Sequence, residues 1–228
     1  MADASGFSLG PPRLRPFGEA AVMIELGGGI DLRSNATALA IADAVRGDAA
    51  GGWLTPLAAY DSVLVPFDPD RLEADLALER LAGIASGVVA RGVVITSGIE
   101  HTIPVRYGGR DGPDLEAVGE VLDLTPAQVV DAHVAQVYRV FVLGFSPGFA
   151  YLGPLPDALQ VPRHAQPRPR IPVGSVAIAG AQTAIYPGAT AGGWQLIGRT
   201  AVRVWDAHRD PPSLLRPGDR VRFEPLRD

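Results

Sequence analysis

The sequence predicts an α+β protein of two domains, an α/β sandwich followed by a closed or nearly closed β-barrel. Strand and helix signals alternate over the first hundred residues, as in an α/β sandwich. From residue 138 onward the predicted elements are short strands separated by turn residues, which is typical of small barrels. Glycine and proline account for 27 and 21 of the 228 residues, which favours many turns over long helices. We therefore expect a first domain over residues 13–100 and a barrel over residues 101–226.

The first domain is predicted to contain five strands and two helices. The strands are Leu14–Phe17, Ala21–Leu26, Leu54–Ala59, Val63–Phe67 and Val93–Thr96. Ser34 or Asn35 can cap the first helix, which runs to about Val45. The second helix, Asp70–Ser86, carries three leucines expected to face inward, Leu72, Leu76 and Leu81. Strand pairs alternating with two helices indicate a sandwich of ferredoxin-like outline.

The second domain is predicted to begin with the strand Thr102–Tyr107 and a helix at Asp114–Leu122. Thr125 and Pro126 are an N-cap and first-turn pair for another helix, which runs to about Gln136. Six strands follow, at Arg139–Phe145, Val176–Ala179, Thr183–Tyr186, Gln195–Arg199, Val202–Trp205 and Arg220–Glu224. The proline-rich stretch Leu152–Pro172 has no strand signal and is predicted to be an ordered functional loop.

Two amino acids are missing from the sequence, cysteine and lysine. The first absence excludes disulfides, thiol nucleophiles and cysteine-based metal sites. The second excludes a lysine-containing phosphate loop and a lysine base or Schiff base. The four histidines form no close pair, so we expect no metal site. No apolar run approaches the roughly 20 residues of a membrane span, and no signal peptide is evident, so a cytoplasmic protein is predicted.

The charges are distributed unevenly along the chain. The whole sequence has a net charge of −5, yet residues 139–203 hold six arginines and the single acid Asp157. A local positive excess within an acidic protein is the place where an anionic ligand would bind. This segment is too short and has too few exposed aromatic residues to indicate a nucleic-acid surface.

The segment Gly144–Gly148 matches the G-x-S-x-G pattern of serine hydrolases, but we reject Ser146 as a nucleophile. In those enzymes the residue after the serine donates its backbone N–H to the oxyanion, and Pro147 has no N–H. An aromatic turn follows the serine here, whereas the hydrolase motif requires a helix. We interpret this segment as a tight turn that shapes the rim of a pocket.

Arg163, Arg168 and Arg170 lie among four prolines, which would present their guanidinium groups from a stiffened loop. Arginine binds carboxylate or phosphate through two hydrogen bonds, so this loop fits an acidic substrate or a nucleotide phosphate. The alternative is that these arginines form surface ion pairs on a solvated loop. For Arg163 and Arg168 both interpretations stay open, whereas for Arg170 the surface ion pair is favoured. Gln182 is expected to be structural or an amide donor, and His133 to be a packed or surface histidine with no catalytic role.

The chain resembles the allophanate hydrolase subunit 1 family, which includes the B subunit of 5-oxoprolinase and the Kip-inhibitor proteins. The matching blocks occur in the family's order: Gly144–Leu152, Pro162-Arg163, Pro167-Arg168, Val173–Thr183, Ile185–Pro187 and Gly192–Gly198. The sequence departs from the family at Thr190-Ala191, usually Ser-Pro, and at Ala177 and Ala184, often glycines. His164 stands where a second arginine is common.

The resemblance implies a ferredoxin-like domain followed by a cyclophilin-like β-barrel. It also implies a protein that works with a larger homologous subunit, namely allophanate hydrolase subunit 2 or the C subunit of 5-oxoprolinase. Together with a further protein, the complex would cleave 5-oxoproline to glutamate at the expense of ATP. The alternative is a regulator that inhibits a sensor histidine kinase. Hydrolysis of allophanate by this chain alone ranks third, because the chain lacks the expected serine and lysine chemistry.

The candidate site residues follow from these motifs. The residues assigned to catalysis are Arg163, Arg168 and Gln182. Those assigned to substrate binding and exclusion of water are Phe145, Pro147, Gly148, Phe149, Tyr151, Tyr186, Gly192, Gly193 and Trp194. ATP is expected to be bound by, or shared with, the partner subunit, because this chain has no phosphate loop. The arginine loop is expected to lie over an aromatic-lined barrel mouth.

Overall fold

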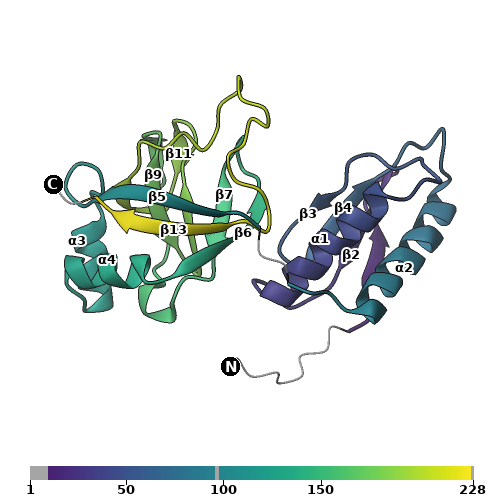
Figure 1. Ribbon diagram of the computed structural model, residues 1–228, viewed down its shortest axis with the longest axis horizontal. Helices are drawn as coiled ribbons and strands as arrows, with labels where there is room; N and C mark the ends of the chain where they lie inside the picture. The colour runs from purple at the N-terminus through teal and green to yellow at the C-terminus, as the bar shows by residue number, and fades with distance from the viewer. Residues whose placement is uncertain (1–9, 96–97, 227–228) are drawn as a thin grey trace. The chain divides into compact units, whose positions relative to one another are not determined.

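A computed structural model describes residues 10–95 and 98–226 of the chain (Figure 1). The chain divides into two compact units, Met1–Thr96 and Ser97–Asp228. None of the helices in the described part is long and apolar enough to cross a lipid bilayer.

The first unit is a two-layer α/β sandwich. Its antiparallel sheet has the order β1-β2-β4-β3, formed by β1 (Arg13–Pro16), β2 (Ala21–Glu25), β3 (Leu57–Ala58) and β4 (Ser62–Pro66). The helices are α1 (Leu32–Arg46) and α2 (Ala74–Arg91). Alternate residues of β2 and β4 are buried in one core with the apolar stripes of both helices. The element order is therefore β-β-α-β-β-α, which differs from the β-α-β-β-α-β order of a ferredoxin-like fold.

Four local predictions for this unit are corrected. The cap of α1 is Asp31, whose carboxylate accepts the Ser34 N–H at 2.7 Å, so the helix begins earlier than predicted. Helix α2 begins at Ala74 because a turn after Asp68 precedes it. Its buried stripe is Ala77, Leu81, Ala85 and Val88, and Leu76 therefore lies on the solvent side. Residues 93–95 form no strand, and residue 96 lies outside the described residues.

The second unit contains the predicted closed β-barrel. Its strand order is β10-β7-β6-β13-β5-β12-β9, and only β5 and β13 pair in parallel. The strands are β5 (Glu100–Tyr107), β6 (Val137–Leu143), β7 (Ala150–Gly153), β9 (Ser175–Ala179), β10 (Gln182–Ile185), β12 (Gln195–Arg199) and β13 (Arg220–Pro225). The remaining elements are α3 (Leu115–Leu122), α4 (Pro126–Val134), the 3₁₀ turn η1 (Asp157–Leu159) and a two-stranded sheet of β8 (Arg168–Ile171) and β11 (Thr190–Gly192).

Sequence patterns miss three strands of this unit and add one. The strands β7, β8 and β11 are not predicted, and β8 lies within the stretch expected to have no strand. The predicted strand Val202–Trp205 is absent, since only Trp205 forms an isolated bridge, to Ser213. The three missed strands are three or four residues long, and segments this short carry too little periodicity to be recognised alone.

The inner face of the barrel wall is mostly aliphatic. Leu152, Thr183 and Ile178 lie opposite one another on β7, β10 and β9, and all three are fully buried. The next inward-facing row along the same strands is Ala150, Ile185 and Val176. This core also takes in side chains of α3 and α4. It is the structural centre of the second unit.

His133 is packed inside this core, which decides between the packed and the surface position that the sequence leaves open. Its Nδ1 lies 2.8 Å from the Tyr107 hydroxyl, and its Nε2 lies 3.0 Å from Thr183 Oγ1. The Thr183 hydroxyl donates its hydrogen to the Ala177 carbonyl, so Nε2 must carry the proton of the neutral imidazole and donate to Thr183. Burial lowers the pKa of His133 from 6.5 to about 3. His133 is therefore a neutral structural histidine.

Candidate active site on the outer barrel wall

The outer face of the same wall carries a layer of aromatic residues over small ones. Tyr151, Ala184, Ala177 and Leu196 lie in one row across β7, β10, β9 and β12. Small side chains on this row leave room for large rings above it. The residues packed there are Phe149, Tyr151, Ile171, Ala177, Ala179, Ala184, Tyr186, Trp194 and Leu196. We call this set the aromatic layer.

The aromatic layer is held by edge-to-face contacts around Phe149. The Phe149 ring centroid lies 4.8 Å from that of Tyr151, 5.3 Å from that of Tyr186 and 5.8 Å from that of Trp194. These distances and the near-perpendicular rings are the favoured geometry for aromatic pairs. The sequence motifs group these residues correctly. They were expected at the barrel mouth, whereas the strand register puts them on the outside of the wall.

The turn between β6 and β7 has a strained backbone that exposes Phe145. Phe145 has a φ of +66°, and the Ser146 N–H donates to the Gly144 carbonyl at 2.8 Å, the hydrogen bond of a γ-turn. A non-glycine residue seldom adopts this conformation. The Phe145 side chain is 62% exposed and meets Phe149 at a centroid distance of 5.3 Å. The turn therefore presents one aromatic ring to solvent at the edge of the aromatic layer.

Pro147 and Gly148 complete this turn. The Phe149 N–H donates to the Ser146 carbonyl at 3.0 Å, and Gly148 has a φ of +78°. A proline followed by a residue with positive φ is typical of a type II turn. A Cβ on Gly148 would lie 2.5 Å from Trp205 Cβ, so only glycine fits there. The turn leads into β7 and not into a helix, so the structure gives Ser146 no hydrolase elbow.

Arg163 lies over the aromatic layer. Its guanidinium carbon is 5.8 Å from the Trp194 ring centroid, within the range of a cation–π interaction. Burial raises the pKa of Tyr151 and of Tyr186, and the positive charge of Arg163 opposes both shifts. No hydrogen bond or ion pair to the Arg163 side chain is found among residues 10–95 and 98–226. Its donors therefore remain available for an anion.

Arg168, in contrast, is committed to partners within the chain. Its Nη2 lies 2.5 Å from Asp114 Oδ1, and its Nη1 lies 2.8 Å from His164 Nε2. Asp114 Oδ2 also accepts the Leu196 N–H at 2.6 Å. Burial favours the neutral carboxyl, but these hydrogen bonds and the charge of Arg168 lower the pKa of Asp114 below its usual value. A direct catalytic role for Arg168 stays a prediction, and its charge is largely compensated.

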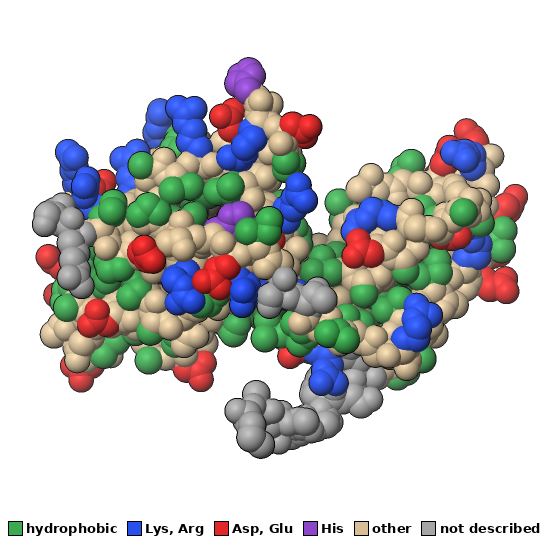
Figure 2. Space-filling model, in the orientation of Figure 1, with side chains coloured by type: hydrophobic (Ala, Val, Ile, Leu, Met, Phe, Trp, Pro, Cys, Tyr) green, Lys and Arg blue, Asp and Glu red, His purple; other side chains and the backbone are tan. Residues whose placement is uncertain are grey.

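The glycine pair before Trp194 makes room for the aromatic layer and the arginine loop. A Cβ on Gly192 would lie 2.5 Å from the Tyr186 hydroxyl oxygen, so a side chain there would displace Tyr186. The Gly193 carbonyl accepts the His164 N–H at 2.7 Å, which fixes the loop against β12. Figure 2 shows arginine side chains gathered along the edge of this unit that carries β9 and β11 in Figure 1.

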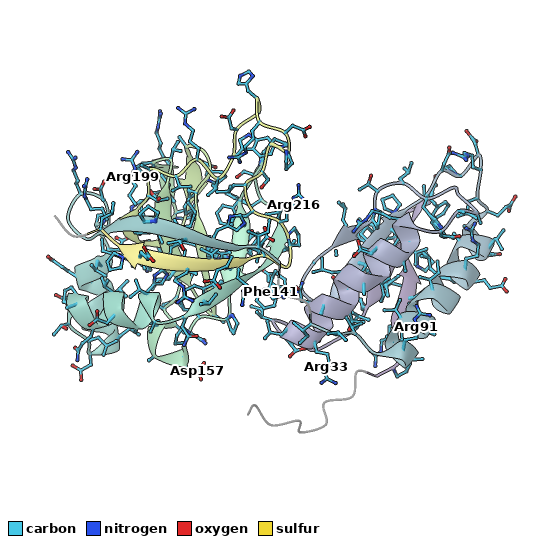
Figure 3. All side chains as sticks on the ribbon, in the orientation of Figure 1. Arg33, Arg91, Phe141, Asp157, Arg199 and Arg216 are labelled. Carbon is cyan, nitrogen blue, oxygen red and sulfur yellow. The ribbon has the colours of Figure 1, made fainter. Side chains whose placement is uncertain are left out.

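Gln182 and Arg199 belong to the same unit but lie elsewhere. Gln182 starts β10 beside the β9–β10 turn, at the opposite end of the strand from Tyr186. Its amide is therefore not brought to the Tyr186 hydroxyl. Arg199, labelled in Figure 3, ends β12 and donates from Nε to the Val173 carbonyl. Neither residue completes the group formed by Arg163, Trp194 and the two tyrosines.

A cavity adjoins the aromatic layer through Tyr186. Its volume is about 410 Å³, within the usual range of small-molecule sites, and it is lined by Val173, Tyr186, Pro187 and residues 202–207. Trp205, which packs against Gly148, forms part of this lining, and so does Arg203. Trp205 therefore both packs against the strained turn and lines the cavity.

Sequence reasoning misses the partners of Arg168. Asp114 is expected from the sequence only at the start of a helix, and His164 only as a departure from the family pattern. Asp114 is separated from Arg168 by 54 residues, and no local pattern connects them. Asp114 is buried at the start of its helix but makes no cap hydrogen bond to it, which indicates that its carboxylate binds another group.

Residues 12–215 match the family model for the carboxyltransferase domain, subdomain C and D. The chain belongs to this family. The B subunit of 5-oxoprolinase from Bacillus subtilis is 37% identical over 92% of this chain and 91% of its own length. The protein of the same name from Escherichia coli O157:H7 is 55% identical over 126 residues, which are 55% of this chain and 58% of that protein.

The crystal structure of TTHA0988 also matches, with a TM-score of 0.79 and 38% identity over 95% of this chain. The match covers 40% of the TTHA0988 chain, so this family member corresponds to less than half of that longer protein. The likeness extends over both units of the chain. The family assignment agrees with the resemblance of the sequence motifs.

Proposed function

We propose that this chain is the B-type subunit of a 5-oxoprolinase, a hydrolase that opens 5-oxoproline to glutamate with ATP. The observation that carries the proposal is the match to the Bacillus subtilis 5-oxoprolinase protein over more than nine-tenths of both chains. The position of Arg163 supports the proposal, because an unpaired guanidinium over an aromatic layer suits a small, partly apolar acid.

In the proposed reaction ATP transfers its terminal phosphoryl group to the lactam oxygen of 5-oxoproline. Water then adds to the activated carbon, the C–N bond of the ring breaks, and phosphate leaves to give glutamate and ADP. Negative charge develops on oxygen during both steps, and fixed cationic donors stabilise it. In this chain Arg163 is the available donor, and the rings of Phe149, Tyr151 and Trp194 exclude water from one side of it.

We propose that a larger homologous partner completes the site and that ATP is bound by this partner or shared with it. The exposed Phe145 supports a contact of this kind, because an aromatic side chain on a rigid turn is a common anchor of protein interfaces. The same residue would serve the second candidate function, inhibition of a sensor histidine kinase. Replacing Phe145 by serine should then weaken binding to whichever of the two partners is the true one.

The test is co-purification with the larger subunit, followed by measurement of ATP hydrolysis that depends on 5-oxoproline. Arg163→Ala should lower the turnover about 10- to 100-fold, since a hydrogen bond to a charged group contributes about 1.5–3 kcal/mol. Arg170→Ala is the matched control, because that arginine is exposed on the following strand β8 and is not placed at the aromatic layer. Equal turnover in both variants would remove Arg163 from the mechanism.

A further inference from the structure

His164 takes part in a three-residue network beside the aromatic layer. Arg168 reaches two acceptors at once, Asp114 Oδ1 through Nη2 and His164 Nε2 through Nη1. The His164 backbone N–H donates to the Gly193 carbonyl at 2.7 Å, so the residue is held at both main chain and side chain. About 30% of the His164 side chain is exposed, and it therefore remains accessible to a ligand.

The contact with Arg168 decides which ring nitrogen of His164 carries the proton. A guanidinium group is always protonated and only donates hydrogen bonds. Two nitrogens 2.8 Å apart therefore require His164 Nε2 to accept, and the proton of the neutral ring must be on Nδ1. Nε2 also lies 3.2 Å from Asp114 Oδ2, but a hydrogen on Nε2 would face the Arg168 N–H group only 2.8 Å away.

The Nδ1–H group of His164 is left without a partner. No hydrogen bond from this nitrogen is found within the described part of the chain. The charges of Arg168 and Asp114 compensate each other, whereas the charge of Arg163 has no ion-pair partner among the described residues. His164 follows Arg163 directly in the chain, so one short segment offers both a neutral N–H donor and a guanidinium to a carboxylate, whose two oxygens accept about four hydrogen bonds.

We propose that Arg168 fixes His164 in its Nδ1–H form and that this N–H, together with Arg163, binds the carboxylate of the substrate. His164 is then a substrate-binding residue and Arg168 a positioning residue. This inference rests on the proposed function for the identity of the substrate, but the fixed form of the histidine ring does not.

The first test is the proton position in the full chain. Nitrogen-15 NMR of the histidine rings, recorded at alkaline pH, distinguishes Nδ1–H from Nε2–H imidazoles. His164 should show the Nδ1–H form, and His133 is an internal reference of the opposite form, because its Nε2 donates to Thr183. Arg168→Ala should remove the preference at His164 and leave His133 unchanged. An Nε2–H form at His164 in the unmodified chain would overturn the proposal.

The second test uses matched ligands. 5-Oxoproline should shift the His164 Nδ1 signal, whereas 2-pyrrolidinone, the same ring without a carboxylate, should not. His164→Asn keeps an N–H near the Nδ1 position and should retain binding, whereas His164→Leu should weaken it about tenfold. Equal shifts with both ring ligands, or no shift with any carboxylate, would overturn the binding role.

Acetate separates this inference from the proposed function. If acetate shifts the His164 signal and 5-oxoproline binds no more tightly than acetate, the carboxylate site stands and 5-oxoproline is not its substrate. If 5-oxoproline binds at His164 but the complex with the larger subunit shows no 5-oxoproline-dependent ATP hydrolysis, the proposed reaction fails and the binding role remains. The two claims are therefore tested independently.

Discussion

The inner and outer faces of the barrel wall formed by β7, β9 and β10 differ in composition and in the role that we assign to each. On β7, β9 and β10 the inner residues are mostly aliphatic and fully buried, and they enclose a neutral histidine whose hydrogen bonds are all satisfied within the core. The outer residues alternate with them and form a floor of alanines beneath aromatic rings and an arginine. A pleated strand presents successive side chains to opposite faces, so one wall can contribute both to stability and to the ligand binding that we propose.

This difference indicates where substitutions should separate stability from binding. Inner positions are closely packed, and changes there should lower the free energy of unfolding. Outer positions lie beside the Arg163 guanidinium, and changes to their polar groups should alter ligand binding more than stability. Each prediction below tests one side of this division.

The largest effect is expected on the inner face. Leu152→Ala removes a fully buried side chain and should lower the free energy of unfolding by about 2–5 kcal/mol. Denaturation followed by tryptophan fluorescence in a Trp53→Phe background would report the barrel unit through Trp194 and Trp205. Carboxylate binding by the folded fraction should be unchanged. A loss of binding equal to that of Arg163→Ala would show that the two faces are not independent.

The next effect concerns the turn that joins β6 to β7. Gly148→Ala should destabilise the barrel unit by about 2 kcal/mol or more, because the residue has a positive φ and the new Cβ would overlap Trp205. Gly188→Ala is the matched control, since nothing lies within 4 Å of the Cβ that it would add and its φ is not positive. Thermal unfolding of the two variants should differ clearly, and similar midpoints would contradict the role given to Gly148.

A third prediction follows from the buried histidine. The pKa of His133 is about 3 in the folded chain and 6.5 in its ordinary state, so between these values the unfolded chain binds one more proton. Stability contributed by His133 is therefore fully present above pH 6.5. It should decrease by up to about 1.4 kcal/mol for each pH unit as the pH falls toward 3.

The measurement is the pH dependence of the free energy of unfolding in the unmodified chain and in His133→Gln. The variant should be less stable at neutral pH but should lose this part of the slope. Identical slopes in the two proteins would show that His133 takes up its proton in the folded state.

The smallest effect is expected on the outer face. Tyr151→Phe removes a hydroxyl from a half-buried ring that keeps its packing on Phe149, so stability should change by less than about 1 kcal/mol. Because Arg163 acts on this hydroxyl electrostatically, substrate affinity should change more than stability does. Calorimetric titration with 5-oxoproline would measure the affinity, and a thermal melt would measure the stability. A large drop in stability with unchanged affinity would show that Tyr151 behaves like a residue of the inner face.

Several features of this protein are encoded in short, local sequence signals. Thr125 and Gln128 form the capping box that begins α4, with Pro126 as its first residue, and the sequence predicts the strand Gln195–Arg199 with its observed bounds. Neighbouring residues are enough to specify both elements, and the same holds for the tight turn after Gly144. The aromatic residues near this turn are grouped correctly because their motif is local.

The difference between the two arginines, by contrast, arises from contacts between distant parts of the chain. Arg163 and Arg168 are alike in sequence context, each following a proline, yet one lies over Trp194 and the other pairs with Asp114. For the residues of β7, β9 and β10, the face of the barrel wall on which a side chain lies is likewise set by the register in which the strands pair. Register and ion pairing join residues far apart in the chain, and their energies depend on burial and distance, which arise only when the strands meet.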